Sequence, residues 1–216
     1  MKLRSLARQF APAVVLRGHS VPNTIKGDGN VTSESRPISD FTSIQAAGAL
    51  EIQWSSGSPA LRITTDQNIL PHIQTGVFGR TLQITYEGSL APTKGIKIAV
   101  ASGAVDHVDM TGAVRFVAQE FTGEVLLVKA TGAATVEIDG NVGDLTANLT
   151  GASRLNGRAL KAKTAKVTLV GASSADIAVE EALKAAITGA SSLTYSGEPA
   201  SLEKNVTGAG KIRRRQ

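Results

Sequence analysis

The sequence contains no cysteine among its 216 residues. This absence excludes disulfide bridges, zinc sites built on cysteine, a thiol nucleophile and a lipid-modified cysteine. It does not restrict the redox compartment, because stacked strands can be held together by hydrogen bonds and apolar burial alone. Regular packing of the chain must therefore supply the stability of the fold.

Large apolar side chains are also scarce. Aromatic residues make up 4% of the sequence, with one tryptophan, although hydrophobic residues reach 42%. The core must then be built from alanine, valine, leucine and isoleucine, which suit a narrow interior better than a bulky globular core. No apolar run approaches the roughly 18 residues that a membrane-spanning helix requires.

The chain is basic, with a formal net charge of +5 and a pI near 9.6. Eight of the 23 basic residues lie near the two ends, at Lys2, Arg4, Arg8 and Arg17 and in the segment Lys211-Ile-Arg-Arg-Arg215. Within the repeat, the column five residues before the glycine holds only a two-lysine stretch, Lys166 and Lys184. A nucleic-acid site needs clustered charge, and single strands also need aromatic side chains for base stacking. We therefore expect no nucleic-acid partner.

What the sequence does contain is a repeat. A Gly-Ala pair returns six times in steps of 20, 19, 20, 18 and 19 residues, at Gly112, Gly132, Gly151, Gly171, Gly189 and Gly208. A fixed period near 20 residues is typical of solenoids, in which each repeat forms one coil resting on the previous one.

Apolar columns spaced by two accompany the glycines. The columns two, four and six residues before the glycine are apolar with few exceptions, as in Leu149, Ala147 and Leu145. The columns four and six residues after it behave alike, as in Leu155 and Ile177, and the columns between them are mostly polar. This alternation predicts two strands per coil with one inward face each, and it does not fit a helical period of 3.6.

We therefore predict an all-β fold, a right-handed parallel β-helix (β-solenoid) with coils of about 19–20 residues. Leu149, Leu169 and Ile187 should stack in one buried ladder, with Val136, Leu155 and Leu193 in the facing strands. The glycines should lie at corners, at positive φ or in close approaches where a Cβ does not fit. Lys166 and Lys184 should lie on the outer face.

The N-terminal residues predict a leader followed by an extended segment. Residues 1–20 combine a basic start with the apolar stretch Phe10–Leu16, a pattern typical of a short secretory signal, although Arg17 and His19 occupy positions where small residues are usual. Residues 21–36 contain turn-forming glycine and proline and are expected to be an extended lead-in.

The rest of the chain is expected to form a single solenoid domain, residues 37–212. Its first section, residues 37–100, contains several alternating strands separated by turn signals, and we expect it to cover the end of the stack. Residues 101–212 should form the regular coils, and residues 213–216 a basic tail.

Short motifs in this order resemble the bacterial putative auto-transporter adhesin "head GIN" domain family. They include Arg36-Pro-Ile-Ser-Asp-Phe41-Thr-Ser-Ile44, Gly48-Ala-Leu-Glu-Ile52, Asp66-Gln-Asn68-Ile-Leu70-Pro-His-Ile73-Gln-Thr75 and Val206-Thr-Gly208-Ala-Gly210-Lys-Ile212. The resemblance covers roughly residues 28–212. It implies an extracytoplasmic β-helical domain of largely undefined molecular role, with no catalytic residues to carry over.

Known catalytic motifs are absent from the sequence. The three histidines, His19, His72 and His107, lack metal-ligand spacing. The alternative of a β-helix polysaccharide lyase or glycosidase requires clustered carboxylates. Glu137 and Asp176 share a column, but Asn156 separates them by two coils, so a solvated strand face is the better interpretation.

The sequence therefore predicts a non-enzymatic, extracytoplasmic binding module of structural or adhesive type. We expect no catalytic residue, no cofactor and no metal site. The expected partner is a surface or matrix ligand, either glycan or protein. A cleft with two or more clustered carboxylates would favour the enzymatic alternative.

Overall fold

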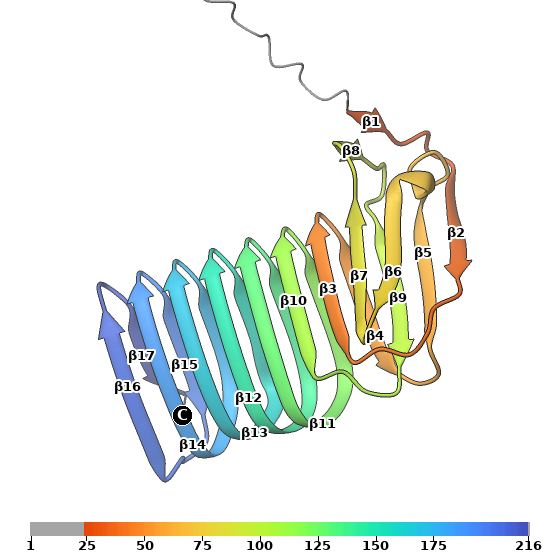
Figure 1. The fold of residues 1–216 in the computed structure, drawn as a ribbon. Coiled ribbons are helices and arrows are strands. Elements are labelled where there is room, and N and C mark those ends of the chain that lie inside the picture. Colours follow the sequence, from red (N-terminus) through yellow and green to blue (C-terminus); the bar gives the residue numbers. More distant parts are fainter. Residues whose placement is uncertain (1–23, 216) are drawn as a thin grey trace, which may run out of the picture.

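The computed structural model describes residues 24–215, and these form a right-handed parallel β-solenoid with additional strands at its N-terminal end (Figure 1). Its elements are β1 (Ile25–Lys26), β2 (Val31–Arg36), β3 (Ser43–Gly48), β4 (Glu51–Ser56), β5 (Ala60–Asp66), the short 3-10 helix η1 (Leu70–His72), β6 (Ile73–Phe78), β7 (Thr81–Tyr86), β8 (Leu90–Ala91), β9 (Lys97–Ser102), β10 (His107–Gly112), β11 (Arg115–Gly132), β12 (Thr135–Gly151), β13 (Arg154–Gly171), β14 (Ser174–Gly189), β15 (Ser192–Ser196), β16 (Ser201–Thr207) and β17 (Lys211–Arg214).

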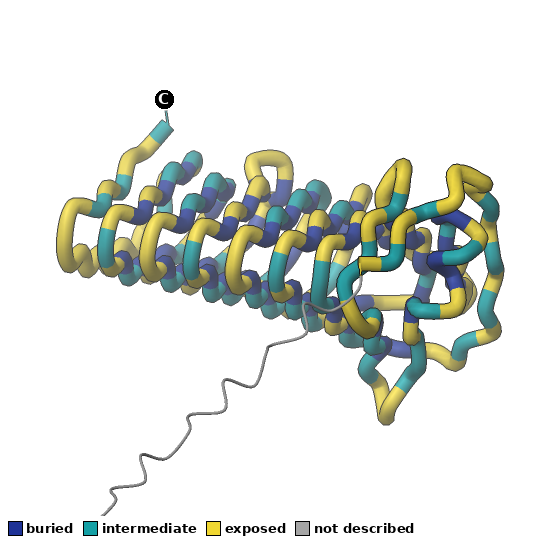
Figure 2. The backbone as a smooth tube through the Cα atoms, turned by 90° about the horizontal axis from the view of Figure 1, so that it is seen from above, coloured by how far each residue is buried: buried dark blue, intermediate teal, exposed yellow. Residues whose placement is uncertain are grey.

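Each coil has two sides, which we name by their position relative to the repeated glycine. The front face consists of the strand segments that precede the glycine, and the back face of those that follow it. Strands β11 to β14 are long because each contains a back segment, a bend and the next front segment. Apolar side chains fill the space between the two faces. Along each coil, buried residues alternate with more exposed ones (Figure 2).

The predicted ladders are confirmed. On the front face, Leu149 pairs with Leu169, and Leu169 pairs with Ile187, with each side chain at most 2% exposed. On the back face, the register joins Val136 to Leu155 and then continues through Ala175 to Leu193. The alternation of apolar and polar residues thus sets the inward and outward sides of every coil.

The glycines form a ladder at the corner between the two faces. Gly151 and Gly171 have φ of +89° and +92°, a region that disfavours any residue with a Cβ. A Cβ on Gly171 would lie 2.9 Å from the carbonyl oxygen of Gly151, and one on Gly151 would lie 2.7 Å from that of Gly132. Both parts of the corner prediction are confirmed, since positive φ and close approach occur together.

A buried serine ladder lies beside the glycines and was not predicted. Ser153, Ser173 and Ser191 are each 1% exposed, and each hydroxyl donates to the carbonyl three residues earlier. The hydroxyls of Ser153 and Ser173 also contact the glycine carbonyl of the preceding coil. These bonds satisfy polar groups that the tight corner removes from water.

The first coil of the stack comes from a part of the chain outside the recognised repeat. Gly48 pairs with Gly112, so β3 and β4 form the coil that precedes β10 and β11. On the other side of this coil, β7 pairs with β3 and β9 pairs with β4, both in parallel. Along the chain, the β3–β4 coil comes first and the β7–β9 coil packs on its N-terminal side. The chain then returns to the other side of the β3–β4 coil, where β10 begins the regular stack.

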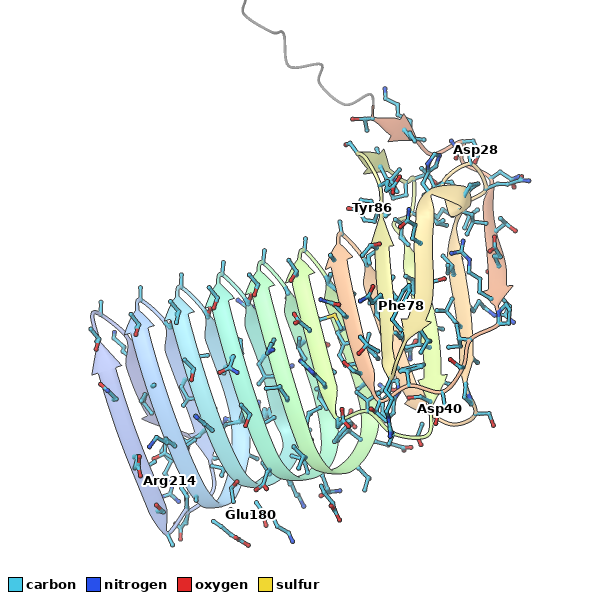
Figure 3. The ribbon with its side chains drawn as sticks, in the orientation of Figure 1. Asp28, Asp40, Phe78, Tyr86, Glu180 and Arg214 are labelled. Carbon is cyan, nitrogen blue, oxygen red and sulfur yellow. The ribbon has the colours of Figure 1, made fainter. Side chains whose placement is uncertain are left out.

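Antiparallel strands cover the N-terminal end of this stack. Strand β6 pairs with β7, β5 pairs with β9, and β2 pairs with β5. The glycine ladder ends at Tyr86, whose ring occupies the place of a Cβ on Gly48 and whose hydroxyl accepts the Ala49 N–H at 3.0 Å (Figure 3). The edge strands at this end are therefore the short antiparallel β6 and β2, which cover the coil behind them.

The lead-in is tied to these strands by a buried carboxylate. Asp66 is 0% exposed, and it accepts hydrogen bonds from the Thr93 hydroxyl at 2.7 Å and from the Thr93 and Gly29 N–H groups at 2.8 Å. These bonds, above all that of the Thr93 hydroxyl, hold the pKa of Asp66 below its ordinary value of 3.8, although burial opposes them. Asp66 thus fixes the segments next to the short β1–β8 pair.

Replacing this carboxylate should make the chain less stable at neutral pH. In Asp66→Asn, the amide NH₂ group would face a hydrogen-bond donor where the native carboxylate accepts. Because the folded-state pKa is lowered, the stabilisation is present at pH above the unfolded value and is lost as pH falls through the folded value. We expect the difference in urea midpoint between native and variant chains to shrink at acidic pH.

The exposed Asp40 provides the control, since Asp40→Asn makes the same chemical change on the surface (Figure 3). We expect its urea midpoint to follow that of the native chain at every pH. An Asp66→Asn variant with the same midpoint as Asp40→Asn at pH 7 would contradict this role of Asp66.

Candidate functional site

The structure brings no predicted histidine into a reactive cluster. His72 ends the short helix η1 and His107 begins β10, while His19 lies outside the described residues. Within residues 24–215, no group of three histidine, aspartate or glutamate side chains is placed to hold a metal ion. No helix in this range is long and apolar enough to cross a membrane.

A long row of outward side chains runs across the back face. The strands of this face are in register, so one residue of each strand lies beside one of the next. We call these residues the back-face row: Ser35, Arg62, Ala99, Gln53, Val117, Glu137, Asn156, Asp176, Thr194 and Arg213.

Local sequence explains why these residues face outward. In β4, Gln53 lies between the buried Ile52 and Trp54; in β9, Ala99 lies between the buried Ile98 and Val100. Because successive side chains of a strand point to opposite sides, burial of the neighbours forces these residues outward. The row is thus fixed by the same alternation that builds the core.

The first seven residues of the row lie in a hollow along the solenoid axis. Three adjoining depressions of about 670, 560 and 450 Å³ make up this hollow, which we call the back-face groove. Gln53 and Ser55 line both the first and the second depression, and Gln119 and Asp139 line both the second and the third. The adjoining depressions therefore extend from the N-terminal strands onto the regular coils.

Irregularities in the strands shape the groove where it reaches the regular coils. The register shifts between Ala118 and Phe121, between Glu137 and Gly140, and between Gly157 and Lys161. Extra residues at such shifts bend a strand and re-aim its side chains. The back face is consequently hollowed here.

Small side chains form the floor of the first depression, and polar side chains surround them. Ala60, Ala99 and Ala101 lie on strands β5 and β9 and leave the floor shallow. Arg62 lies beside Ala99 and forms no side-chain hydrogen bond or ion pair within residues 24–215. A ligand in this depression can therefore approach the backbone closely and contact the Arg62 guanidinium.

Another arginine of this depression already has partners. The guanidinium of Arg36 donates to Glu34 at 2.6 Å, to the Ile73 carbonyl at 2.6 Å and to the Leu70 carbonyl at 3.1 Å. These bonds hold β2 against the segment around η1. Arg36 is thus part of the wall of the first depression, and Arg62 is the cation of this depression that is available to a ligand.

The groove also contains three carboxylates, Glu120, Glu137 and Asp139. Glu137 forms an ion pair with Arg115 at 2.9 Å, and Asp139 accepts the backbone N–H of Glu120 at 2.6 Å. Glu120 itself has φ of +53°, so this contact holds a strained bend. Two of the three carboxylates therefore make contacts that support the local structure.

The spacing predicted for the shared acidic column is confirmed. Glu137 pairs with Asn156, and Asn156 pairs with Asp176, so two coil steps separate the acids. Asp176 forms an ion pair with Arg215. Each of the two acids thus has an arginine partner, and the two do not face each other as a catalytic pair.

Comparison with solved structures identifies the same fold in proteins from Bacteroides and Parabacteroides. A crystal structure of a putative adhesin from Bacteroides fragilis has a TM-score of 0.74 and 19% identity, covering 88% of this chain and 100% of its own. A putative lipid binding protein from Parabacteroides distasonis has a TM-score of 0.55 and 19% identity, covering 89% of this chain and 100% of its own. A putative adhesin from Parabacteroides merdae has a TM-score of 0.52 and 19% identity, covering 89% of this chain and 99% of its own.

Comparison of sequences gives a more specific result. No curated protein matches the chain. Residues 40–199, most of the chain, match the family described as "Putative auto-transporter adhesin, head GIN domain". This match agrees with the resemblance of the short motifs, and the chain belongs to that family.

Proposed function

We propose that the chain is a non-enzymatic binding module and that the back-face groove holds an extended ligand. The observation that carries this proposal is the continuity of the groove, which joins strands of the N-terminal section to the regular coils through shared lining residues. Binding sites are usually concave and combine apolar floor with a few directed polar groups. The floor of alanines beside Arg62 and Gln53 has this character.

The dimensions suit a polymer more than a compact small molecule. From Ser35 to Asn156 the row crosses seven strands, and six steps of roughly 4.8 Å give about 29 Å. An extended polypeptide of about nine residues has this length. Amide and hydroxyl side chains along the row can bond to a polypeptide or a glycan, so the proposed partner is a surface or matrix polymer of either class.

A catalytic role is the weaker alternative. The groove does contain clustered carboxylates, which is the feature that would favour a glycosidase or lyase. The ion pair of Glu137 and the backbone contact of Asp139 instead give both groups structural roles. The family description and the titles of the solved relatives name adhesins and a lipid binding protein, which also supports a binding module.

We further propose that the module acts outside the cytoplasm. The basic and apolar pattern of residues 1–20 and the family description support this location. Residues 1–20 lie outside the described part of the chain. Protein recovered from a non-cytoplasmic fraction of the native host should begin near residues 20–25, and intact Met1 on protein from the cytoplasmic fraction would contradict the proposal.

The binding function is tested with a glycan and matrix-protein array, followed by titration of any ligand found. The variant Ala99→Trp would fill the floor of the groove from an exposed strand position without changing the core. We expect at least a tenfold loss of affinity, because the bulky ring would occupy the space in which the ligand lies.

Ala186→Trp is the matched control, since Ala186 is an outward residue of β14 on the front face. We expect this variant to bind as the native chain does. Equal affinity of both tryptophan variants would contradict the groove as the binding site. Degradation of an array polysaccharide that is lost in Glu137→Gln would support the enzymatic alternative instead.

A further inference from the structure

The two ends of the solenoid differ in whether further strands cover the terminal coil. At the N-terminal end, antiparallel strands cover the β7–β9 coil. At the other end, β16 pairs only with β14, and β17 pairs only with β15, within residues 24–215. In the described part of the chain, no further coil lies beyond them (Figure 2). Two rows of backbone N–H and C=O groups are therefore free at this end, which is a template for pairing with another strand.

Apolar side chains of the last coil are exposed as a result. Leu202 and Val206 continue the inward ladders of Leu183 and Ile187, which are 1% and 2% exposed. Leu202 and Val206 are themselves 41% and 42% exposed, because no coil covers them. The interior of the solenoid thus continues to the surface at this end.

A lysine interrupts the apolar column between these two residues. Lys204 pairs with Ala185, and the same inward column holds Val108, Val128, Ala147 and Val167 in the other coils. The Lys204 ammonium lies 5.2 Å from the centre of the Tyr195 ring on the opposite side of the coil. The lysine therefore lies across the open end of the interior, and no carboxylate contacts it within residues 24–215.

The facing strand carries a second charge in an inward column. Arg214 pairs with Tyr195 in register and donates to Glu198 at 2.6 Å at the far end of the stack (Figure 3). The hydrogen bond from Arg214 and the positive charge of its guanidinium hold the pKa of Glu198 below its ordinary value. Arg214 thus already has an acidic partner, which leaves Lys204 as the unpaired inward cation.

A second copy of the chain is a poor occupant of this end. Two β16 strands meeting in antiparallel orientation would pair Leu202 with Val206 of the other copy, but Lys204, the central residue of β16, would meet itself. The last coil also carries five basic and only two acidic side chains from residue 197 to residue 215. Like charges placed opposite each other in a sheet are destabilising. The charge of the last coil therefore disfavours pairing between two copies of the chain at this end.

We propose that the C-terminal coil is a docking edge for an extended acidic polypeptide segment that pairs with β16. Main-chain hydrogen bonds to the free edge would supply affinity, and side-chain matching would supply specificity. The fitting segment has an acidic residue flanked, two positions away on each side, by apolar residues that cover Leu202 and Val206. This pattern is symmetric about its centre, so it places the carboxylate at Lys204 in either strand orientation.

The probe is a terminally blocked peptide of sequence Thr-Val-Thr-Glu-Thr-Val-Thr, compared with the same peptide carrying a central lysine. Binding to the folded native chain is measured by calorimetric titration and by NMR shift changes. We expect the glutamate peptide to bind at least tenfold more tightly than the lysine peptide. The variant Lys204→Glu should reverse this preference, because it reverses the charge that faces the centre of the peptide.

Lys211→Glu is the control, since Lys211 lies on the outward side of β17 in the same coil and makes the same change in net charge. This variant should keep the preference of the native chain. Failure of both peptides to bind, equal binding of both, or loss of the preference in Lys211→Glu as much as in Lys204→Glu would each overturn the proposal. A native chain that dimerises in sedimentation equilibrium, with concentration-dependent NMR shift changes in β16, would also overturn it.

Discussion

Replacing Gly171 by valine should destabilise the chain by roughly 2–6 kcal/mol, the sum of strain at positive φ and overpacking. The glycine has φ of +92°, and an added Cβ would lie 2.9 Å from the Gly151 carbonyl oxygen. Because this oxygen accepts the N–H of Ala172 at 2.8 Å, it cannot move away without breaking a bond of the corner. Chemical denaturation followed by far-UV circular dichroism measures the loss.

Lys166→Val is the matched control, because Lys166 lies on the outer side of the same strand, β13. As an exposed substitution it should change the free energy of unfolding by less than about 0.5 kcal/mol. Each coil rests on its neighbours, so we expect the damage from Gly171→Val to spread along the stack. If the two valine variants unfold at the same denaturant concentration, the glycines are not essential corners.

Replacing Trp54 by alanine should cost about 3–5 kcal/mol, as removal of large buried side chains does. Trp54 is 3% exposed on β4, and its ring centre lies 5.9 Å from that of Phe121 on β11. Its indole N–H donates to the Ser102 hydroxyl of β9 at 3.0 Å. The side chain therefore joins three coils that come from distant parts of the sequence.

Ser102→Ala separates the hydrogen bond from the packing. This variant keeps the ring in place and removes its acceptor, which should cost about 1 kcal/mol. Urea denaturation of both variants gives the comparison. A Trp54→Ala variant that loses no more stability than Ser102→Ala would contradict the view that Trp54 joins the N-terminal section to the stack.

The regular coils could be predicted because they are local. A Gly-Ala pair every 18 to 20 residues, with apolar columns at fixed offsets, determines both the corner and the inward side of each strand. The repeat did not predict the β3–β4 coil, although Gly48-Ala49 is the same Gly-Ala pair. Its partner glycine, Gly112, lies 64 residues later, so a fixed period cannot reveal that the two pair.

Part of the candidate site could be predicted for the same reason. The column of Glu137, Asn156 and Asp176 follows from the repeat, and the structure places it on the back face as expected. Ala99 and Arg62 could not be found in this way, because their pairing depends on strands laid down out of order and on an antiparallel edge. The sequence shows a serine after each Gly-Ala pair from Gly151 to Gly189, but the burial of these serines was not predicted.

The absence of cysteine makes one direct measurement of the binding surface possible. A single cysteine introduced by Ala99→Cys would report on the groove, and one introduced by Ala186→Cys would report on the front face. Each variant is treated with a thiol reagent with and without saturating array-identified ligand. We expect the ligand to slow modification at position 99 at least tenfold and to leave modification at position 186 unchanged. Protection at position 186 without protection at position 99 would contradict the back-face groove as the binding site.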